Sequence, residues 1–210
     1  MAITYIESTK TFYLDGKGVT YAFCVNDYDY LEHLYFGKTI GHDDIRYVRG
    51  CGATDNNPKI PGVEMKVGYA YGSLDSYQYF APELAFFGTG DYREPAVQIK
   101  TEQGDRISDL LYDSYEILPV KPMPNGMPAM RDGETLVIHL KDRVNGFGCD
   151  LYYTVYDDAA VIARRAVYKN GCDATVMLNR AYSFSVTLPQ LDFDVLTLHG
   201  SWASERHIQR

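Results

Sequence analysis

Two alternating apolar runs flank a turn signal in the stretch Glu134-Thr-Leu-Val-Ile-His-Leu-Lys-Asp-Arg-Val-Asn-Gly-Phe-Gly-Cys-Asp-Leu-Tyr-Tyr-Thr-Val155. Within each run, apolar side chains recur at every second position, the spacing that puts them on one face of a β-strand. The turn signal Asn145-Gly146 favours a tight hairpin between the runs. The stretch therefore predicts two antiparallel strands with a shared buried face. The apolar positions on that face are Leu136, Ile138 and Leu140 in the first run and Leu151, Tyr153 and Val155 in the second.

The same period of two extends along most of the chain, and helical periodicity is nearly absent. Residues 19–25 alternate, and residues 176–188 form the cleanest run, in which Arg180 alone breaks the apolar face. A buried Arg180 needs a carboxylate or carbonyl partner. Residues 134–198 read as an almost continuous meander. The chain is therefore predicted to be all-β, an antiparallel β-sandwich rather than a set of βαβ units. Further turn signals are Asp15-Gly16-Lys17-Gly18, Asp157-Asp158 and Asn170-Gly171.

The composition argues against several classes of function. The 210 residues carry a formal net charge of −8, whereas binding to nucleic acid or to an anionic membrane surface requires a basic patch. No apolar run approaches the length of a membrane span, and the N-terminal residues lack the basic and apolar regions of a secretory signal. We therefore expect a cytoplasmic protein with no nucleic-acid partner and no membrane partner.

The histidines and cysteines predict neither a metal site nor a cofactor. The 4 cysteines are scattered without metal-ligand or Cys-x-x-Cys spacing, which favours free thiols in a reducing compartment. His33 and His139 fall within strand patterns, where a hydrogen-bonded sheet residue is the more common interpretation than a metal ligand. The adjacent carboxylates Asp157-Asp158 fall in a turn and are expected to be solvated.

Two loops interrupt the strand pattern. Residues 41–87 are rich in Gly, Asp, Asn, Pro and Tyr, and a loop of this length is expected to be functional or disordered. Residues 119–128 hold four prolines and predict extended, polyproline-like backbone that crosses the surface. The prolines lie inside a folded domain, so an ordered connection is favoured over a docking peptide.

The C-terminal stretch Gly200-Ser-Trp-Ala-Ser-Glu-Arg-His-Ile-Gln-Arg210 holds the only tryptophan of the chain. An indole beside Glu205, Arg206 and His207 is suited to stack on a flat ligand such as a sugar while its neighbours form hydrogen bonds. The alternative is a tryptophan that plugs the end of the sandwich. The chain stops within this pattern, without a polar tail, so we expect it to be part of a larger protein.

Six sequence blocks in the same order resemble the N-terminal domain of the α-galactosidases of glycoside hydrolase family 36. The similarity runs from near residue 10 to the end, and its second and last blocks are the most specific. The blocks are Leu31-Glu-His-Leu-Tyr-Phe-Gly-Lys38, Gly88-Thr-Gly-Asp-Tyr-Arg-Glu-Pro-Ala96, Gly126-Met-Pro-Ala129, Glu134-Thr-Leu136, Leu151-Tyr-Tyr-Thr-Val-Tyr156 and Gly200-Ser-Trp-Ala-Ser-Glu-Arg-His207.

The resemblance implies an N-terminal β-supersandwich, a central TIM barrel and a small C-terminal sheet domain. Such enzymes hydrolyse terminal α-galactosides such as melibiose and raffinose with retention, through two aspartates on barrel strands. The barrel is absent from these 210 residues. We therefore expect residues 1–210 to be the supersandwich domain, or its first part with exposed sheet edges, inactive alone and without a catalytic residue.

The resemblance also assigns one binding residue. Trp202 matches the tryptophan that lines the sugar pocket beside the barrel in this family. For Glu205 and Arg206, an ion pair or a domain-docking contact is the stronger interpretation, and Asp91 with Arg93 is interpreted as a turn-fixing pair. The family forms homo-oligomers, often tetramers, with loops that reach a neighbour's active site. Residues 41–72 depart from the family's usual pattern there, so that contact is not carried over.

Two other interpretations stay open. One is a stand-alone carbohydrate-binding module that stacks sugars on Trp202 and several tyrosines, and the other is a structural interaction domain without a ligand. Binding modules usually carry two or more exposed aromatic side chains on one face, whereas here the one tryptophan lies where a barrel would follow. That position favours the scaffold of an enzyme.

Overall fold

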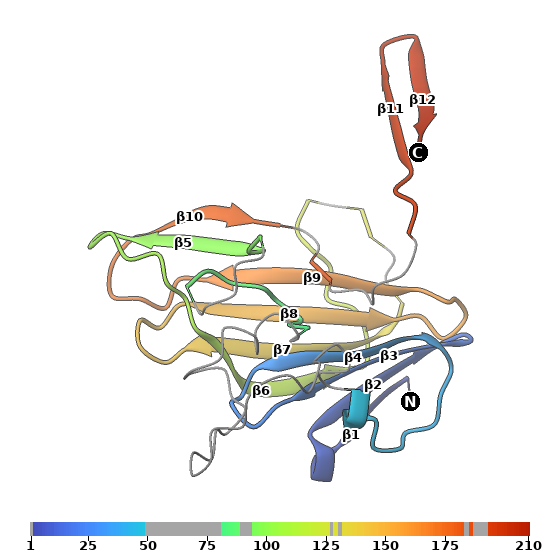
Figure 1. Cartoon of the computed structure of the whole chain (residues 1–210), viewed down its shortest axis with the longest axis horizontal. Helices are drawn as coiled ribbons and strands as arrows, with labels where there is room; N and C mark the ends of the chain where they lie inside the picture. The colour runs from blue at the N-terminus through green and yellow to red at the C-terminus, as the bar shows by residue number, and fades with distance from the viewer. Residues whose placement is uncertain are drawn as a thin grey trace, which may run out of the picture.

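Two four-stranded antiparallel sheets, packed face to face, form the body of the molecule (Figure 1). The computed structural model describes residues 2–48, 81–88, 94–126, 128–129, 132–182, 185–186 and 193–210. The first sheet has the order β1-β2-β3-β4, with β1 (Ile3–Ile6), β2 (Thr11–Gly16), β3 (Val19–Val25) and β4 (Leu31–Lys38). The second has the order β6-β7-β8-β9, with β6 (Leu110–Leu118), β7 (Glu134–Asp142), β8 (Gly148–Val155) and β9 (Ile162–Lys169). The expectation of an all-β antiparallel sandwich is confirmed.

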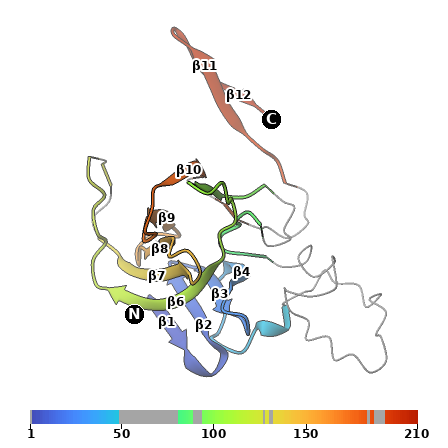
Figure 2. The same ribbon diagram turned by 90° about the vertical axis from the view of Figure 1, so that its left-hand side faces the viewer.

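Two smaller pairs of strands complete the described fold. They are β5 (Val97–Thr101) with β10 (Val176–Ala181), and the hairpin of β11 (Thr197–Ser201) with β12 (Ser204–Gln209). Two short 3-10 helices, η1 (Glu7–Thr9) and η2 (Arg46–Val48), lie in connections of the N-terminal quarter. Figure 2 shows the β11–β12 hairpin standing away from the sandwich, joined to it only through the preceding segment.

The hairpin predicted at Asn145-Gly146 is confirmed. β7 and β8 pair antiparallel, and the pair next to the turn is Lys141 with Gly148. Gly146 has a φ of 83°, a conformation that glycine adopts without steric cost. The predicted buried face is also present, because Leu136, Ile138 and Leu151 are fully buried.

The core lies between the two sheets and is rich in aromatic side chains. Phe23 of β3 stacks on Phe12 of β2, with ring centroids 5.2 Å apart, and on Tyr153 of the opposite sheet, with centroids 5.0 Å apart. Each large side chain buried in this way contributes about 1.5–3 kcal/mol relative to an exposed one. The core therefore joins the N-terminal quarter of the chain to residues more than a hundred positions later.

The first sheet is buried on both faces, which simple alternation does not predict. A second apolar cluster covers its outer face and includes Tyr13, Cys24, Leu34 and Ile45. Ile45 comes from the segment that leads into η2 and packs over the sheet. The first part of the predicted 41–87 loop is thus ordered as a cover, and residues 49–80 lie outside the described part of the chain.

The run 176–188 differs from its prediction. β10 ends at Ala181 and carries an irregularity between Leu178 and Arg180, so the alternation breaks and Leu178 is 44% exposed. β10 also pairs with β5 rather than with β9, which ends the meander. Arg180 has the predicted partner: it forms an ion pair with Glu94 and lies over the Tyr182 ring. The second half of the run is largely outside the described residues.

The proline-rich connection after β6 contacts the second sheet. Lys121 Nζ donates a hydrogen bond to the Tyr156 hydroxyl at 3.0 Å, and Arg165 donates to the Pro122 carbonyl at 3.4 Å. The Arg165 guanidinium also lies 4.0 Å from the centre of the Tyr152 ring. These contacts support the interpretation of this segment as an ordered connection.

Candidate functional site

Trp202 lies at the tip of the β11–β12 hairpin, in the two-residue turn between the paired residues Ser201 and Ser204. Its side chain is 93% exposed. Because the hairpin projects from the sandwich in both ribbon views (Figures 1 and 2), the indole does not plug the end of this sandwich. A large aromatic surface held out in water at the end of an arm is suited to contact another surface or a flat ligand.

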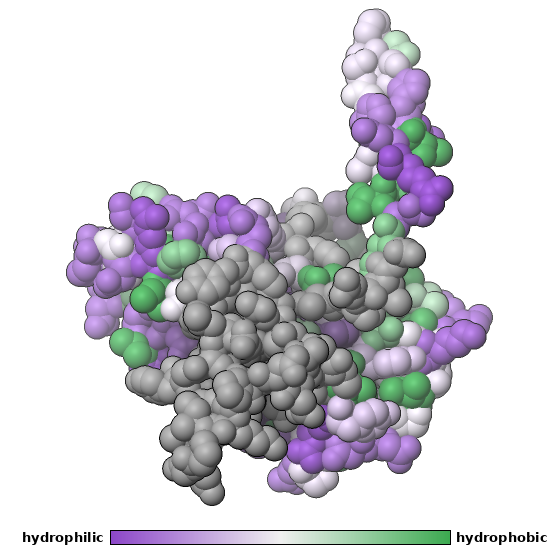
Figure 3. Space-filling view, viewed as in Figure 1, coloured by the Kyte–Doolittle hydropathy of each residue, from purple (hydrophilic) through white to green (hydrophobic). Residues whose placement is uncertain are grey.

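The hairpin has two chemically different faces. Leu198 and Ile208 form one cross-strand pair and are 68% and 73% exposed. The next pair, His199 and His207, lies on the opposite face because side chains alternate along a strand. Figure 3 shows apolar surface on the projecting hairpin and at its base. An isolated two-stranded hairpin is at best marginally stable in water, and this one leaves its apolar cross-strand pair exposed.

Glu205 and Arg206 follow the turn and are both exposed. Within the described ranges, no ion pair joins these two side chains, and the alternative of a domain-docking contact stays a prediction. The ion pair of this region is instead at the base of the arm. There Arg210 donates hydrogen bonds to both carboxylate oxygens of Asp194, at 2.7 and 2.5 Å. The predicted pair of Asp91 and Arg93 lies outside the described residues.

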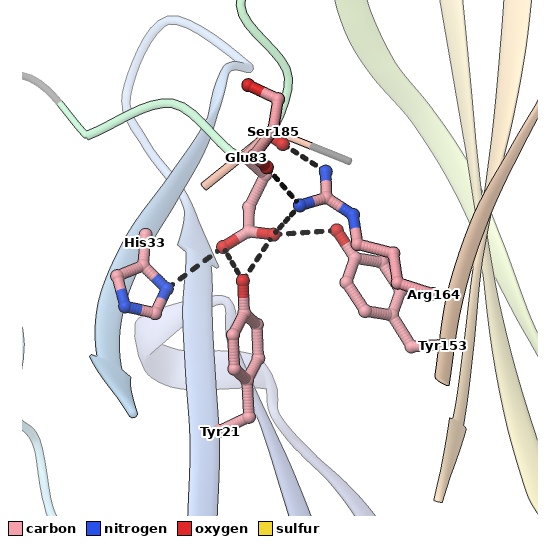
Figure 4. A network of polar contacts seen from close by, with 6 residues as sticks. All are labelled: Tyr21, His33, Glu83, Tyr153, Arg164 and Ser185. Carbon is pink, nitrogen blue, oxygen red and sulfur yellow. Dashed lines mark hydrogen bonds and ion pairs between the residues drawn. The ribbon is translucent and has the colours of Figure 1, made fainter. Parts of the chain in front are cut away.

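A second polar site, centred on Glu83, lies buried between the two sheets (Figure 4). The Tyr21 hydroxyl lies 2.7 and 2.8 Å from the two Glu83 oxygens, and the Tyr153 hydroxyl lies 2.8 Å from Oε2. His33 Nδ1 lies 3.1 Å from Oε1. Arg164 Nη1 lies 3.5 Å from Oε2 and donates to the Ser185 carbonyl at 2.7 Å, while Nη2 donates to the Glu83 carbonyl.

These contacts keep the Glu83 carboxyl ionised. Burial raises its pKa, but the hydrogen bond from His33, the Arg164 charge and the Tyr21 hydroxyl together hold that pKa below its usual value of 4.5. Burial raises the pKa values of Tyr21 and Tyr153 well above 10, so both phenols remain neutral hydrogen-bond donors. The site is therefore a carboxylate saturated by donors.

The Glu83 site resembles acid–base machinery in its residue types but not in its access to solvent. The Glu83 side chain has no exposed surface, and that of Arg164 is 11% exposed. A substrate cannot reach such a carboxylate, and its lone pairs already accept hydrogen bonds. The site instead ties the segment before β5 to β3 and β4 of one sheet and to β8 and β9 of the other. Sequence reasoning missed it, because Glu83 falls inside the long 41–87 loop.

A row of ionisable side chains crosses the second sheet. His139 Nδ1 lies 2.8 Å from Asp150 Oδ1, and His139 Nε2 lies 3.8 Å from Glu116. Lys169 also pairs with Asp150. His33 and His139 are thus both hydrogen-bonded sheet residues, as predicted. Among the residues that the structure describes, no group of three or more His, Cys, Asp or Glu side chains is placed to hold a metal ion. The same residues include no helix long and apolar enough to cross a bilayer.

Comparison with known proteins gives a consistent family. The family described as "Glycosyl hydrolase family 36 N-terminal domain" matches this chain over residues 29–210. The chain is 34% identical, over its whole length, to the α-galactosidase AgaA of Geobacillus stearothermophilus, of which it covers 28%. It is also 34% identical, over its whole length, to the bifunctional α-galactosidase/sucrose kinase AgaSK of Mediterraneibacter gnavus, of which it covers 22%.

Solved structures agree with the fold. The α-galactosidase AgaB of Geobacillus stearothermophilus superposes on the whole chain with a TM-score of 0.83 and 33% identity, and the chain covers 28% of it. A variant of AgaA from the same organism, solved in complex with raffinose, superposes on 95% of the chain with a TM-score of 0.80 and 32% identity. The chain thus spans about a quarter of the length of the proteins it matches.

Proposed function

The chain belongs to glycosyl hydrolase family 36 through that family's N-terminal domain, and we propose that it serves an α-galactosidase as the sandwich that supports a catalytic TIM barrel. In this proposal Trp202 forms one wall of the sugar pocket, where its indole stacks on the apolar face of a terminal galactose. The observation that carries the proposal is the exposed indole at the tip of an arm that projects from the sandwich.

The proposed reaction is hydrolysis of terminal α-galactosides, of the melibiose and raffinose type, with retention. Retention requires two carboxyl groups about 5–5.5 Å apart on either side of the glycosidic bond. Glu83, the most deeply buried carboxylate among the described residues, is closed to any substrate. We therefore assign no catalytic residue to this chain and place both carboxylates in the barrel that would follow it.

The partners follow from the same proposal. The chain packs against its own barrel, contacts the substrate as part of the parent enzyme and takes part in a homo-oligomer in the cytoplasm. The exposed apolar face of the β11–β12 hairpin supports such packing, because apolar area left in water favours association. Residues 1–210 then act as the supersandwich domain or as its first part.

A stand-alone carbohydrate-binding module is the competing function. The exposed indole of Trp202 would suit that role as well. Its position disfavours the module, because a binding face usually presents several aromatic side chains, and β11 and β12 carry histidines and aliphatic side chains beside the tip.

The test compares hydrolysis of a chromogenic α-galactoside by this chain and by a version extended through the downstream coding region. We expect the short chain to be inert and the extended one to be active. In the extended protein, Trp202→Ala should raise KM or lower kcat. Tyr47→Ala is the matched control, because Tyr47 is an exposed aromatic on η2 rather than on the hairpin. Turnover by the short chain, or a downstream region that encodes no barrel, would contradict the proposal.

A further inference from the structure

A side-chain hydrogen bond lies at the start of β12, directly after the turn that carries Trp202. Ser204 Oγ and His207 Nε2 lie 2.7 Å apart, and the imidazole tautomer decides which atom donates. Ser204 pairs with Ser201 across the turn, and His207 pairs with His199. The bond therefore spans Glu205 and Arg206, where the pairing of the two strands is irregular. This side-chain contact restrains the backbone between Ser204 and His207.

Two residues beside this bond need such support: Ala203, directly before Ser204, and Arg206, directly before His207. Ala203 and Arg206 have φ values of 63° and 62°, in the left-handed region that non-glycine residues rarely adopt. Backbone of this kind persists only where surrounding contacts hold it. The hairpin is exposed on all sides, so packing against the sandwich does not supply that support. In the described part of the chain, the contacts that hold this backbone therefore come from within the hairpin.

The pairing register explains where the irregularity lies. His199 pairs with His207 and Ser201 pairs with Ser204, so Gly200 alone faces both Glu205 and Arg206. This is a β-bulge, which re-aims the end of a strand. A Cβ on Gly200 would lie 2.7 Å from the Glu205 Cα and would also clash with the Ser204 carbonyl oxygen. The bulge thus brings the two strands into close backbone contact next to the turn that carries Trp202.

We propose that His207 is a positioning residue for Trp202. Its bond to Ser204 locks the bulge and the left-handed turn, and so fixes the direction in which the indole leaves the tip of the hairpin. The effect on catalysis rests on the proposed function: an indole that is already held in one orientation loses less conformational entropy when it binds a sugar than a mobile one. The orientation of the Trp202 side chain can be measured on the 210-residue chain, whether or not the proposed function is correct.

The chain offers a direct probe of that orientation, since Trp202 is its only tryptophan. Time-resolved fluorescence anisotropy of the 210-residue chain reports indole motion on the nanosecond scale. In His207→Ala and in Ser204→Ala we expect the amplitude of the fast depolarising component to rise about twofold, since loops and side chains freed from a constraint move on that scale. His207→Gln, whose amide can replace the ring nitrogen, should restore most of the wild-type anisotropy.

His199→Ala is the matched control. It removes an imidazole from the same hairpin face, with a ring centroid 6.0 Å from that of His207, and leaves the Ser204 bond in place. Its anisotropy should stay at the wild-type value. An unchanged anisotropy in His207→Ala, or an equal change in His199→Ala, would overturn the inference, whatever the enzyme activity shows.

The extended enzyme then separates this inference from the proposed function. His207→Ala should change KM in the same direction as Trp202→Ala, and the double variant should match Trp202→Ala alone, because the two residues act through one contact. If Trp202→Ala leaves turnover of the α-galactoside unchanged, the proposed function fails while the anisotropy result stands. If the two effects add, His207 does not act through Trp202 and the inference fails.

Discussion

The Arg164 guanidinium contacts both the side chain and the main chain of Glu83: Nη1 lies 3.5 Å from the carboxylate Oε2, and Nη2 donates to the Glu83 carbonyl. β9 and the segment before β5, which are 81 residues apart, are joined at this point. A buried ion pair does not by itself add stability, but loss of one partner leaves an uncompensated buried charge. Removing one partner of this pair therefore tests whether the Glu83 site holds the two sheets together.

Replacing the carboxylate should destabilise the whole sandwich. We expect Glu83→Gln to lower the free energy of unfolding by about 3–5 kcal/mol, because Arg164 is left as an unpaired buried cation. Urea unfolding followed by far-ultraviolet circular dichroism measures this change. Glu94→Gln removes a carboxylate from the more exposed pair with Arg180 and should cost only about 0.2–1 kcal/mol. Equal effects of the two substitutions would show that the Glu83 site does not tie the sheets.

The Glu83 site should also make stability depend on pH. The pKa of Glu83 is lowered in the folded state from its ordinary value of 4.5, so the unfolded state binds the proton more readily. The contribution of Glu83 is then fully present above about pH 4.5 and is lost as pH falls through the lower folded-state pKa. The measurement is the free energy of unfolding from pH 6 down to pH 3. The Glu83→Gln variant should show a shallower decline than the wild type, and a parallel decline in both would contradict the assignment.

The apolar face of the hairpin gives a prediction about association. Leu198 and Ile208 leave a pair of large apolar side chains in water. We expect the 210-residue chain to self-associate at high concentration through this face, and the double substitution Leu198→Ser with Ile208→Ser to reduce that association. Sedimentation velocity over a range of concentrations measures it. Thr197→Ser with Gln209→Ser changes the pair next along the hairpin and should leave the distribution unchanged.

Sequence periodicity predicts the strands whose partners are neighbours in the chain. The β7–β8 hairpin is predicted because Asn145-Gly146 sets the turn and the alternation sets the buried face. β10 is the opposite case. Its partner β5 lies more than seventy residues earlier, and its alternation is broken at Asn179 between two paired positions. Local pattern carries no information on such a partner, and for this reason the predicted meander of residues 134–198 is longer than the one in the structure.

The Glu83 site and the Trp202 hairpin also show how far local sequence pattern can predict a site. Glu83 bonds to residues that are 50, 62 and 70 positions away, so no spacing in the sequence could identify the cluster. Trp202 could be singled out, because it is the only tryptophan and lies in a block shared with a family. Its exposure could not be predicted, because the burial of an indole depends on what surrounds the hairpin. The left-handed Ala203 and Arg206 carry no residue signal either, since glycine or asparagine is the usual marker of that conformation.

Gly200 provides a test of the bulge that does not depend on any side-chain hydrogen bond. A methyl group there would meet the backbone of Ser204 and Glu205, which cannot move aside as a flexible side chain would. We expect Gly200→Ala to force the two strands apart, to release the left-handed turn and to raise the fast anisotropy component of Trp202 at least as much as His207→Ala does.

The same substitution should leave the sandwich intact, because β11 and β12 are exposed along their whole length and contribute little to the core. The midpoint of urea unfolding should therefore change by no more than the experimental error, while the fluorescence changes. Gly41→Ala is the control, since among the described residues its new methyl group would meet the Asp43 carboxylate alone, at an ordinary contact distance of 3.4 Å. A large loss of global stability in Gly200→Ala would mean that the hairpin is part of the folding core and not a separately built arm.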